Sequence, residues 1–370
     1  MTNSHVASHK SEATGASLAR VLCLGDLGPT EERKCDLRFF FHYPEADFVH
    51  VGMGPSQQAQ ERTISLGLAR KNFLAGKYAM VVAGHIPVPM VNPRKNIWRG
   101  MAHFLSQSRS PARAVCAWQA QRMLPLFGPK LAILDLEDRP IIDNRRFFAA
   151  SCCRWYFKRE LPQNPANAFL YTSDKNEDNG NIPRQPFFAE IIPKLRPISI
   201  GVEPALLAER PTCDKTADLF FAGRTANRPN RILGLRNLLR LRDEGYRMDL
   251  PETKLSKPEF LAHCAAALTV WSPEGFGYDC RRTYEAAAMG AVPVLQYPTI
   301  QRHAPLLDGV HAIYYGVEGE HLYHVLKAYL DQPERLEQMG QAVRAHVAQH
   351  HGFGALARHI VRVGTESIPQ

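Results

Sequence analysis

Charged side chains crowd one short stretch of the sequence, residues 271–295. The stretch reads WSPEGFGYDCRRTYEAAAMGAVPVL and places Glu274, Arg281, Arg282 and Glu285 around two glycines. The Ala-rich segment after the arginines predicts a helix, and the loop before it is rich in glycine. Such a loop at a helix N-terminus is a ready anion site, because free backbone N–H groups and the helix dipole both favour negative charge.

The residue types in this loop favour a phosphate-bearing ligand. Arg281 and Arg282 fall in the first turn of the predicted helix, where cations are unfavourable unless an anion neutralises them. The planar donor fork of arginine also matches phosphate oxygens. Gly275 and Gly277 let the backbone approach a ligand without a Cβ in the way.

Glu285 lies three and four residues after the two arginines, on the same face of the predicted helix. Its carboxylate suits a sugar diol such as a ribose, from which it would accept two hydrogen bonds. The alternative is an ion pair with Arg281, a common surface feature that contributes little to stability. Glu274, in the loop itself, is expected to face the same site.

The elements that must position these residues follow an α/β pattern. Apolar runs of strand length alternate with helical patterns, which predicts parallel strands joined by helices. The runs are continuously apolar, as expected for sheets that are covered on both faces. Strands are expected within 19–28, 46–53, 78–87, 130–138, 154–161, 196–204, 217–224, 267–273 and 291–297, and helices within 65–77, 281–290 and 321–351 with a break at Pro333.

The length of 370 residues suggests two domains. Residues 1–17 are polar and lack the apolar centre of a signal peptide, so we expect a disordered tail. With a boundary near residue 205, the first domain covers 18–205, the second covers 206–345, and a helical segment at 346–370 follows. No apolar run approaches the roughly 20 residues that span a bilayer, so a cytoplasmic protein is expected.

Charge and cysteine content limit the partners. The net charge of +9 favours an anionic partner such as nucleic acid, acidic lipid or a phosphorylated small molecule, although a solvated basic surface would look the same. The sequence contains no nucleic-acid recognition motif. It also has no GxGxxG motif, which a nicotinamide-dependent enzyme would be expected to carry. The eight cysteines have neither metal-ligand spacing nor a disulfide framework, which is typical of reduced, buried thiols.

The segment SPEGFGYDCRRTYEAAAMGAVPVL resembles the donor-binding motif of exostosin-like glycosyltransferases and of the wider group 1 glycosyltransferases. ADLFFAGR resembles the strand and loop that open their nucleotide-binding domain, and YFKREL and PISIGVEP resemble segments late in their N-terminal half. The resemblance covers roughly residues 150–310. One departure concerns Glu274 and Glu285, which are eleven residues apart, whereas the group 1 families often space two glutamates more closely.

The resemblance implies a GT-B fold, in which two Rossmann-like domains with parallel sheets face a central cleft and the C-terminal helix crosses back to the first domain. The second domain would bind a nucleotide-sugar, with Glu285 on the ribose. Arg281 or Arg282, with backbone N–H groups near Gly277 and Tyr278, would bind the diphosphate.

A second set of candidates for the diphosphate follows the strand at 217–224. Arg224 stands first, with Arg228 and Arg231 nearby. Preorganised cations at this point would stabilise the charge that the leaving diphosphate gains in the transition state.

The implied reaction moves a sugar from the nucleotide-sugar to a cell-surface glycan, a glycolipid or a polysaccharide precursor. The resemblance implies no metal and no other cofactor, because the nucleotide-sugar is a substrate. The sequence has no Asp-x-Asp pair in a suitable loop, and Asp135 and Glu137 follow a strand of the other domain. A sugar-nucleotide epimerase of the same fold is the alternative enzyme, and peripheral contact with an anionic membrane is a further expected interaction.

The acceptor hydroxyl needs a base if the enzyme inverts configuration. His85 is the leading candidate, since it follows a strand of the first domain and its ordinary pKa suits base work near neutral pH. Asp26 follows the first strand and is the second candidate. For each residue the alternative is a structural hydrogen bond in a loop, and a retaining enzyme would need neither.

Overall fold

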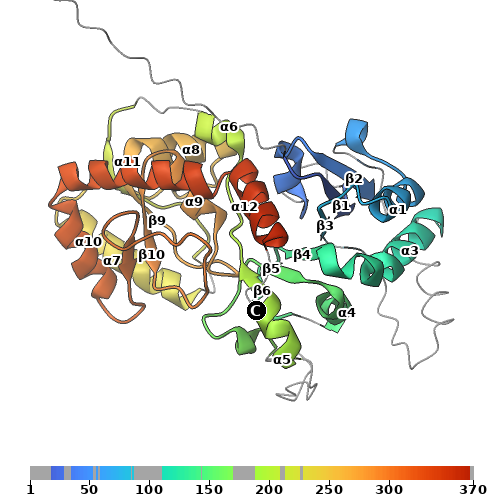
Figure 1. Ribbon diagram of the computed structural model, residues 1–370. Helices are drawn as coiled ribbons and strands as arrows, with labels where there is room; N and C mark the ends of the chain where they lie inside the picture. The colour runs from blue at the N-terminus through green and yellow to red at the C-terminus, as the bar shows by residue number, and fades with distance from the viewer. Residues whose placement is uncertain are drawn as a thin grey trace, which may run out of the picture.

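The computed structural model describes residues 18–28, 35–52, 56, 59–84, 86, 111–142, 144–169, 188–208, 213–225 and 228–366. Within these ranges the chain forms two parallel-sheet α/β domains, as the sequence predicts (Figure 1). The expected tail, residues 1–17, lies outside the described residues. No helix in the described part of the chain has the length and apolar character that a bilayer-spanning helix requires.

The first domain is built on a six-stranded sheet with the order β2-β1-β3-β4-β5-β6, all parallel. Its strands are β1 (Val21–Gly25), β2 (Ala46–His50), β3 (Met80–Ala83), β4 (Leu131–Asp135), β5 (Trp155–Lys158) and β6 (Leu195–Pro197). Its helices are η2 (Arg38–His42), η3 (Gln60–Arg62), α1 (Leu66–Leu74), α3 (Pro111–Phe127), η4 (Gly128–Lys130), α4 (Asn144–Cys152), η5 (Pro165–Phe169), α5 (Phe188–Ile191) and η6 (Ile192–Lys194).

The second domain has a five-stranded parallel sheet with the order β11-β10-β9-β7-β8. Its strands are β7 (Ala217–Phe220), β8 (Met248–Asp249), β9 (Ala267–Trp271), β10 (Val292–Gln296) and β11 (Ile313–Tyr315). The helices from here to the end are α6 (Pro204–Ala208), α7 (Pro229–Asp243), α8 (Lys257–Ala266), α9 (Arg281–Ala288), α10 (His321–Leu330), α11 (Pro333–His350) and α12 (Phe353–Thr365).

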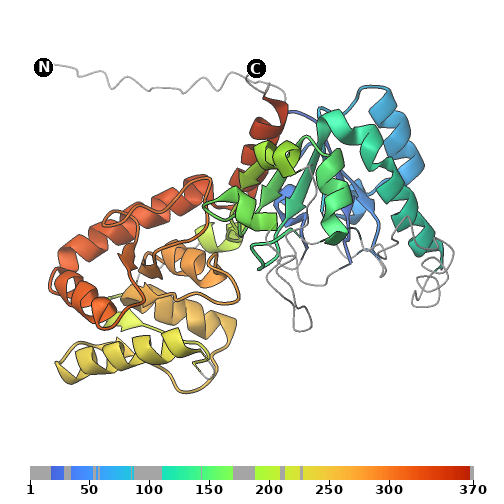
Figure 2. The same ribbon diagram turned by 90° about the horizontal axis from the view of Figure 1, so that it is seen from below.

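The last helix belongs to the core of the first domain. Phe353, Leu356 and Ile360 of α12 are buried in the same apolar cluster as residues of β1 and η2. Figure 2 shows α12, in red, at the junction of the two domains. The chain therefore returns to the first domain after completing the second. The C-terminal helix α12 connects the two domains by packing into the core of the first.

Both sheets reverse their strand order once. In the first sheet the reversal lies between β1 and β3, and in the second it lies between β7 and β9. The loops that leave such a switch point diverge to opposite faces, which opens a crevice at the carboxyl ends of the strands. The sequence candidates Asp26, His85, Gly275 and Arg281 all follow one of these four strands.

The observed strands differ from the expected ones in two ways: two strands were not expected, and one expected strand is shorter. The strands β8 and β11 lie at edges of the second sheet and are too short to give a clear apolar run. The strand expected over 196–204 is only Leu195–Pro197. Beyond it the backbone bonds elsewhere: the N–H of Ile200 donates to Asp279 Oδ2 and its carbonyl accepts from Arg38. Contacts with side chains replace the sheet ladder there.

Histidine rings gather where α11 passes into α12. The ring centroids of His303 and His351 are 4.9 Å apart, and those of His303 and His359 are 4.6 Å apart. The ring nitrogens of His351 bond to Ser199 Oγ and to the carbonyl of Ala304, both at 2.8 Å. Burial lowers the pKa of His303 to about 4 and that of His359 to about 3, so these rings are neutral at pH 7. The charge of Asp279 raises the pKa of His303, and the other titratable groups that influence the three rings are His346, His350, Arg302 and Arg362.

We expect this cluster to make the protein sensitive to acid. In the unfolded chain each histidine takes up a proton below about pH 6.5, whereas His303 stays neutral in the folded protein down to about pH 4. The unfolded state then binds more protons, so stability is lost as the pH falls through this window. The slope is about 1.4 kcal/mol per pH unit for each such histidine.

Urea denaturation between these pH values checks the prediction with two variants. His303→Gln should reduce the loss of unfolding free energy with acid by about 1 kcal/mol per pH unit. His324→Gln, on the exposed side of α10, is the matched control and should keep the wild-type slope. Equal slopes in the two variants would show that the cluster does not control the acid sensitivity.

Candidate functional site

The loop between β9 and α9 is fixed by hydrogen bonds within the second domain. The N–H of Glu274 donates to Gln296 Oε1 at 3.0 Å. Arg231 donates twice to the Glu274 carbonyl, at 2.7 and 3.2 Å, and Arg228 Nη1 donates to the Gly275 carbonyl at 3.1 Å. The loop backbone is therefore held from α7 and from the end of β10.

The first domain contacts the same loop through a buried carboxylate that accepts hydrogen bonds from the loop backbone. Glu160, which follows β5, accepts the N–H of Tyr278 at 3.0 Å and that of Asp279 at 2.9 Å. A Cβ at Gly277 would lie 2.3 Å from Glu160 Oε1, so close approach of this side chain requires glycine. The Tyr278 N–H, which the sequence assigns to a diphosphate, is thus engaged by the protein itself.

Asp279 completes the contact between the domains. Its Oδ2 accepts the N–H of Ile200 and its Oδ1 accepts the hydroxyl of Tyr284, both at 2.6 Å. The Nε atoms of Arg159 and Arg302 lie 3.5 and 3.6 Å from its carboxylate. Burial, and then the charge of Asp279, raises the pKa of Glu160. We call Glu160, Arg159 and Asp279 the interdomain clamp.

A pocket of about 290 Å³ lies beside the clamp, with walls from both domains. Its lining includes Arg159 and Asp138 from the first domain and Arg231, Arg281 and Arg282 from the second. The charged residues of this lining are four arginines and one aspartate. The volume is near the lower end for small-molecule sites, about 300 Å³, and the charge selects an anion.

Arg282 is packed closely against the strand β7 and the loop that follows it. Its guanidinium lies 5.2 Å from the ring centre of Phe221, and a Cβ at Gly223 would come within 2.8 Å of its Nη2. Its Nη1 is buried and has no hydrogen-bond partner among the described residues. Burial lowers the pKa of Arg282. A buried, unsatisfied cation is costly, and an anion in the pocket would offset that cost.

The structure brings together some of the sequence candidates for the diphosphate and not others. Gly275, Gly277, Arg281 and Arg282 line the pocket. Arg224 and Arg228 do not appear in its lining: Arg224 is exposed, and the Arg228 guanidinium bonds to the loop backbone. Arg231, one helical turn after Arg228, reaches the pocket instead. The sequence spacing shows that Arg228 and Arg231 lie on the same turn at the start of α7. Only the packing of α7 in the folded protein determines which of the two reaches the pocket.

The two glutamates of the motif lie away from this lining. Glu285 forms an ion pair with Lys257 at the start of α8, and its expected contact with a ribose stays a prediction. Glu274 accepts a hydrogen bond from Asn230 Nδ2 at 3.1 Å.

The helix α9 ends where the sequence predicts, because Gly290 follows its C-cap with a φ of +75°.

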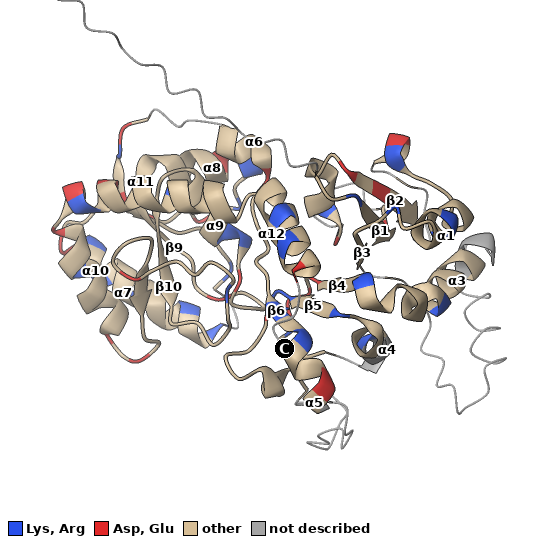
Figure 3. Ribbon diagram, in the orientation of Figure 1, with Lys and Arg blue, Asp and Glu red and all other residues tan. Residues whose placement is uncertain are grey.

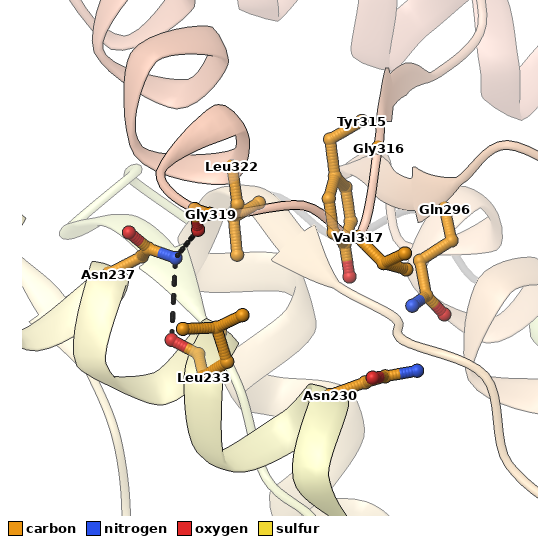
Figure 4. A pocket seen from close by; sticks show the side chains of 10 residues that line it. Asn230, Leu233, Asn237, Gln296, Tyr315, Gly316, Val317, Gly319 and Leu322 are labelled. Carbon is orange, nitrogen blue, oxygen red and sulfur yellow. Dashed lines mark hydrogen bonds between the residues drawn. The ribbon is translucent and has the colours of Figure 1, made fainter.

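A second, much smaller pocket supports the loop from the other side of Glu274 (Figure 4). Asn230 and Gln296, which both bond to Glu274, form part of its wall. Asn237 Nδ2 donates to the carbonyls of Leu233 and Gly319. With a volume of about 10 Å³ it has room for one water molecule and not for a substrate.

Asp26, the second catalytic candidate, follows β1 at the switch point of the first sheet. Asp26 Oδ1 accepts the N–H of Gly28 at 2.8 Å and lies 3.8 Å from His50 Nδ1. The hydrogen bond from Gly28 is the structural role for Asp26 that the sequence analysis gives as the alternative to catalysis. His85 lies outside the described residues, so its role stays a prediction. His50, at the end of β2, is a titratable neighbour that the sequence alone did not single out.

No group of histidine, cysteine or acidic side chains suited to a metal ion occurs among the described residues. Asp135, the first of the alternating acids and the last residue of β4, is buried with cations. Arg146 Nη1 lies 2.6 Å and Lys158 Nζ 3.1 Å from its carboxylate, and the Tyr156 hydroxyl donates to it at 2.8 Å. These cations lower the pKa of Asp135 despite its burial, which by itself raises it.

A protein-family model described as glycosyl transferase-like matches residues 238–362, about a third of the chain. The matched part includes the loop before α9. A search of curated proteins gives no match.

Solved structures match over nearly the whole chain. Sucrose-phosphate synthase from Thermosynechococcus elongatus aligns with a TM-score of 0.51 and 11% identity, over 93% of this chain and 98% of that one. The OtsA apo structure aligns with a TM-score of 0.50 and 9% identity, over 95% and 100%. Anabaena HepE in complex with UDP aligns with a TM-score of 0.48 and 13% identity, over 93% and 99%. The fold is GT-B, and these matches do not single out the exostosin-like subgroup.

The clamp predicts a large effect for one substitution. Glu160→Ala leaves two buried N–H groups and Arg159 without their carboxylate, so the free energy of unfolding should fall by about 2–4 kcal/mol. Glu137→Ala removes an exposed carboxylate paired with Arg146 and should cost less than about 1 kcal/mol. Chemical denaturation of both variants measures the difference. If Glu160→Ala is no less stable than Glu137→Ala, the clamp is not a main contact between the domains.

Proposed function

We propose that this protein is a glycosyltransferase that moves a sugar from a nucleotide-sugar to a cell-surface glycan, a glycolipid or a polysaccharide precursor. The observation that carries the proposal is the buried, unsatisfied Arg282 Nη1 beside a pocket lined by four arginines between two parallel-sheet domains. The glycosyl transferase-like match over 238–362 favours transfer over epimerisation.

The donor diphosphate binds in the arginine pocket. Arg282 and Arg281 approach it from α9, Arg231 from α7 and Arg159 from the first domain. When the bond between sugar and phosphate breaks, negative charge grows on the diphosphate, and preorganised guanidinium groups stabilise it. Because Glu160 engages the N–H groups of Tyr278 and Asp279, side-chain cations supply most of this stabilisation.

The nucleoside extends from the pocket along α9 towards Lys257. Glu285, one turn after Arg282, accepts the ribose hydroxyls, and Lys257 holds its carboxylate in place. The acceptor enters from the first domain, where His85, or Asp26 beside His50, serves as base if the reaction inverts configuration. The reaction uses no metal and no other cofactor, and the enzyme works in the cytoplasm with a peripheral contact to anionic membrane.

Calorimetric titration with UDP, GDP, ADP and CMP tests the donor site. At least one nucleotide should bind at submillimolar concentration. Arg282→Met removes the charge while filling the same space, and should weaken binding about 10- to 100-fold, as expected for a lost charged hydrogen bond. Arg242→Met, on the exposed side of α7, is the control. Absence of binding to the wild type, or equal binding by Arg282→Met, would contradict the proposal.

Comparing a nucleotide with pyrophosphate tests Glu285 separately. Glu285→Gln should weaken binding of the best nucleotide by about 1–3 kcal/mol, because the ribose loses a charged acceptor. Binding of pyrophosphate, which has no ribose, should not change. If Glu285 only pairs with Lys257, both affinities stay at the wild-type value and the variant differs only in stability.

A further inference from the structure

The chain passes between the two domains at two places that lie against each other. Val202, after β6, and Gly352, before α12, form a parallel bridge. The N–H of Val202 donates to the carbonyl of His351 at 2.9 Å, and the N–H of Phe353 donates to the carbonyl of Val202 at 3.2 Å. A Cβ at Gly201 would lie 2.9 Å from the same carbonyl of His351, so the two crossings are closely packed. A hinge motion of the domains would turn about these crossings.

A second connection between the domains uses other parts of the chain. Residues 161–163 of the first domain run antiparallel to residues 299–301 of the second. Two backbone hydrogen bonds join these segments: the N–H of Gln301 donates to the carbonyl of Leu161 at 2.7 Å, and the N–H of Gln163 donates to the carbonyl of Thr299 at 2.8 Å. We call this pair of segments the interdomain latch.

The residue types in the latch suit this pairing. Pro162 lies opposite Ile300 at its centre. The backbone hydrogen bonds come from the residues on either side of Pro162, so proline, which has no N–H, fits at this position. Leu161 and Ile300 are buried. Separating the segments would therefore expose apolar surface to water as well as break the backbone bonds.

Two glutamine side chains add to the latch. Gln163 Nε2 donates to the carbonyl of Ile300 at 2.9 Å. Gln301 Nε2 donates to the carbonyls of Pro162 and Gln163, at 3.2 and 3.1 Å. Each side chain thus bonds to the backbone of the opposite segment. Two backbone and three side-chain hydrogen bonds therefore join the domains at this point.

The latch continues the interdomain clamp along the chain, since Arg159 and Glu160 directly precede it. Figure 3 shows blue and red segments around β5 and β6, at the junction of the domains. The clamp is built from charged groups, whereas the latch contains only leucine, proline, glutamine, threonine and isoleucine. Salt screens interactions between charges and leaves the hydrogen bonds of the latch largely unchanged. The latch should therefore hold the domains together under conditions that weaken the clamp.

We propose that the interdomain latch keeps the two domains in one closed arrangement, whether or not a ligand occupies the arginine pocket. Domain interfaces within a chain usually permit relative motion. Here a turn about the crossings would break the hydrogen bonds of the latch and those of Glu160 at the same time. The walls that the two domains contribute to the pocket then keep their separation. A ligand enters a preformed site, which removes the cost of ordering the domains on binding.

Small-angle X-ray scattering of the whole chain tests this arrangement. The radius of gyration of the wild type should be the same at about 0.1 M and about 1 M sodium chloride, and should not change when pyrophosphate is added as a probe of the pocket. Gln163→Ala/Gln301→Ala removes the three side-chain bonds of the latch and should have a larger radius of gyration at the higher salt concentration, where the clamp is weakened. The control Gln60→Ala/Gln332→Ala removes glutamine bonds within single domains and should behave as the wild type does.

The wild type decides the question even if the latch variant folds poorly, which circular dichroism would show. In the wild type the amides of Gln163 and Gln301 should exchange hydrogen roughly a hundredfold or more slowly than in an unstructured peptide. Exchange at the peptide rate, or a radius of gyration that falls with pyrophosphate or rises with salt, would overturn the proposal. Identical scattering by Gln163→Ala/Gln301→Ala and the wild type at high salt would also overturn it. None of these results depends on sugar transfer, so they are distinct from a failure of nucleotide binding.

Discussion

Two buried carboxylates on opposite sides of the domain boundary constrain this structure most strongly. A carboxylate removed from water must receive hydrogen bonds and a counter-charge, or it is strongly destabilising. Glu160 takes its hydrogen bonds from the backbone of the second domain, and Asp279 takes one from Ile200 between the two sheets. Arg159 lies against both. Separating the domains would take both backbone donors from Glu160 and the Ile200 N–H from Asp279, so the contact between the domains and the shape of the loop before α9 depend on each other.

This arrangement explains why arginines are tolerated at the start of α9. A helix N-terminus favours an anion, and here the Glu160 carboxylate accepts the N–H of Asp279, two residues before α9 begins. The guanidinium groups of Arg281 and Arg282 line the pocket, where their charge adds to the positive end of the helix dipole. The pocket exists because Asp138 and Arg159 of the first domain close over the loop. A ligand there would contact both domains at once, as a transferase that joins a donor and an acceptor requires.

Local sequence patterns were sufficient for much of the fold. Buried parallel strands are continuous apolar runs, so most strands could be located, as could α9 with its glycine stop. The loop at the second switch point, which the sequence suggested as an anion site, lines a pocket with four arginines, and anion binding there stays a prediction. The clamp could not be found in this way, because Glu160 and Asp279 are far apart in sequence and each resembles an ordinary loop acid. The partner of Glu285 was missed for the same reason: Lys257 comes from another helix. Arg231 lines the pocket and Arg224 does not. The sequence alone could not separate these two candidates, because packing determines which side of the segment after β7 faces the pocket.

The clamp is expected to organise the pocket before any ligand binds. Hydrogen exchange of the Tyr278 and Asp279 amides in the protein alone, followed by NMR, measures this directly. If both amides donate to buried Glu160, they should exchange roughly a hundredfold or more slowly than in an unstructured peptide. Exchange at the rate of an unstructured peptide would mean that the loop is free in solution. The domains would then not be joined by this contact, and the clamp could not be what shapes the arginine pocket.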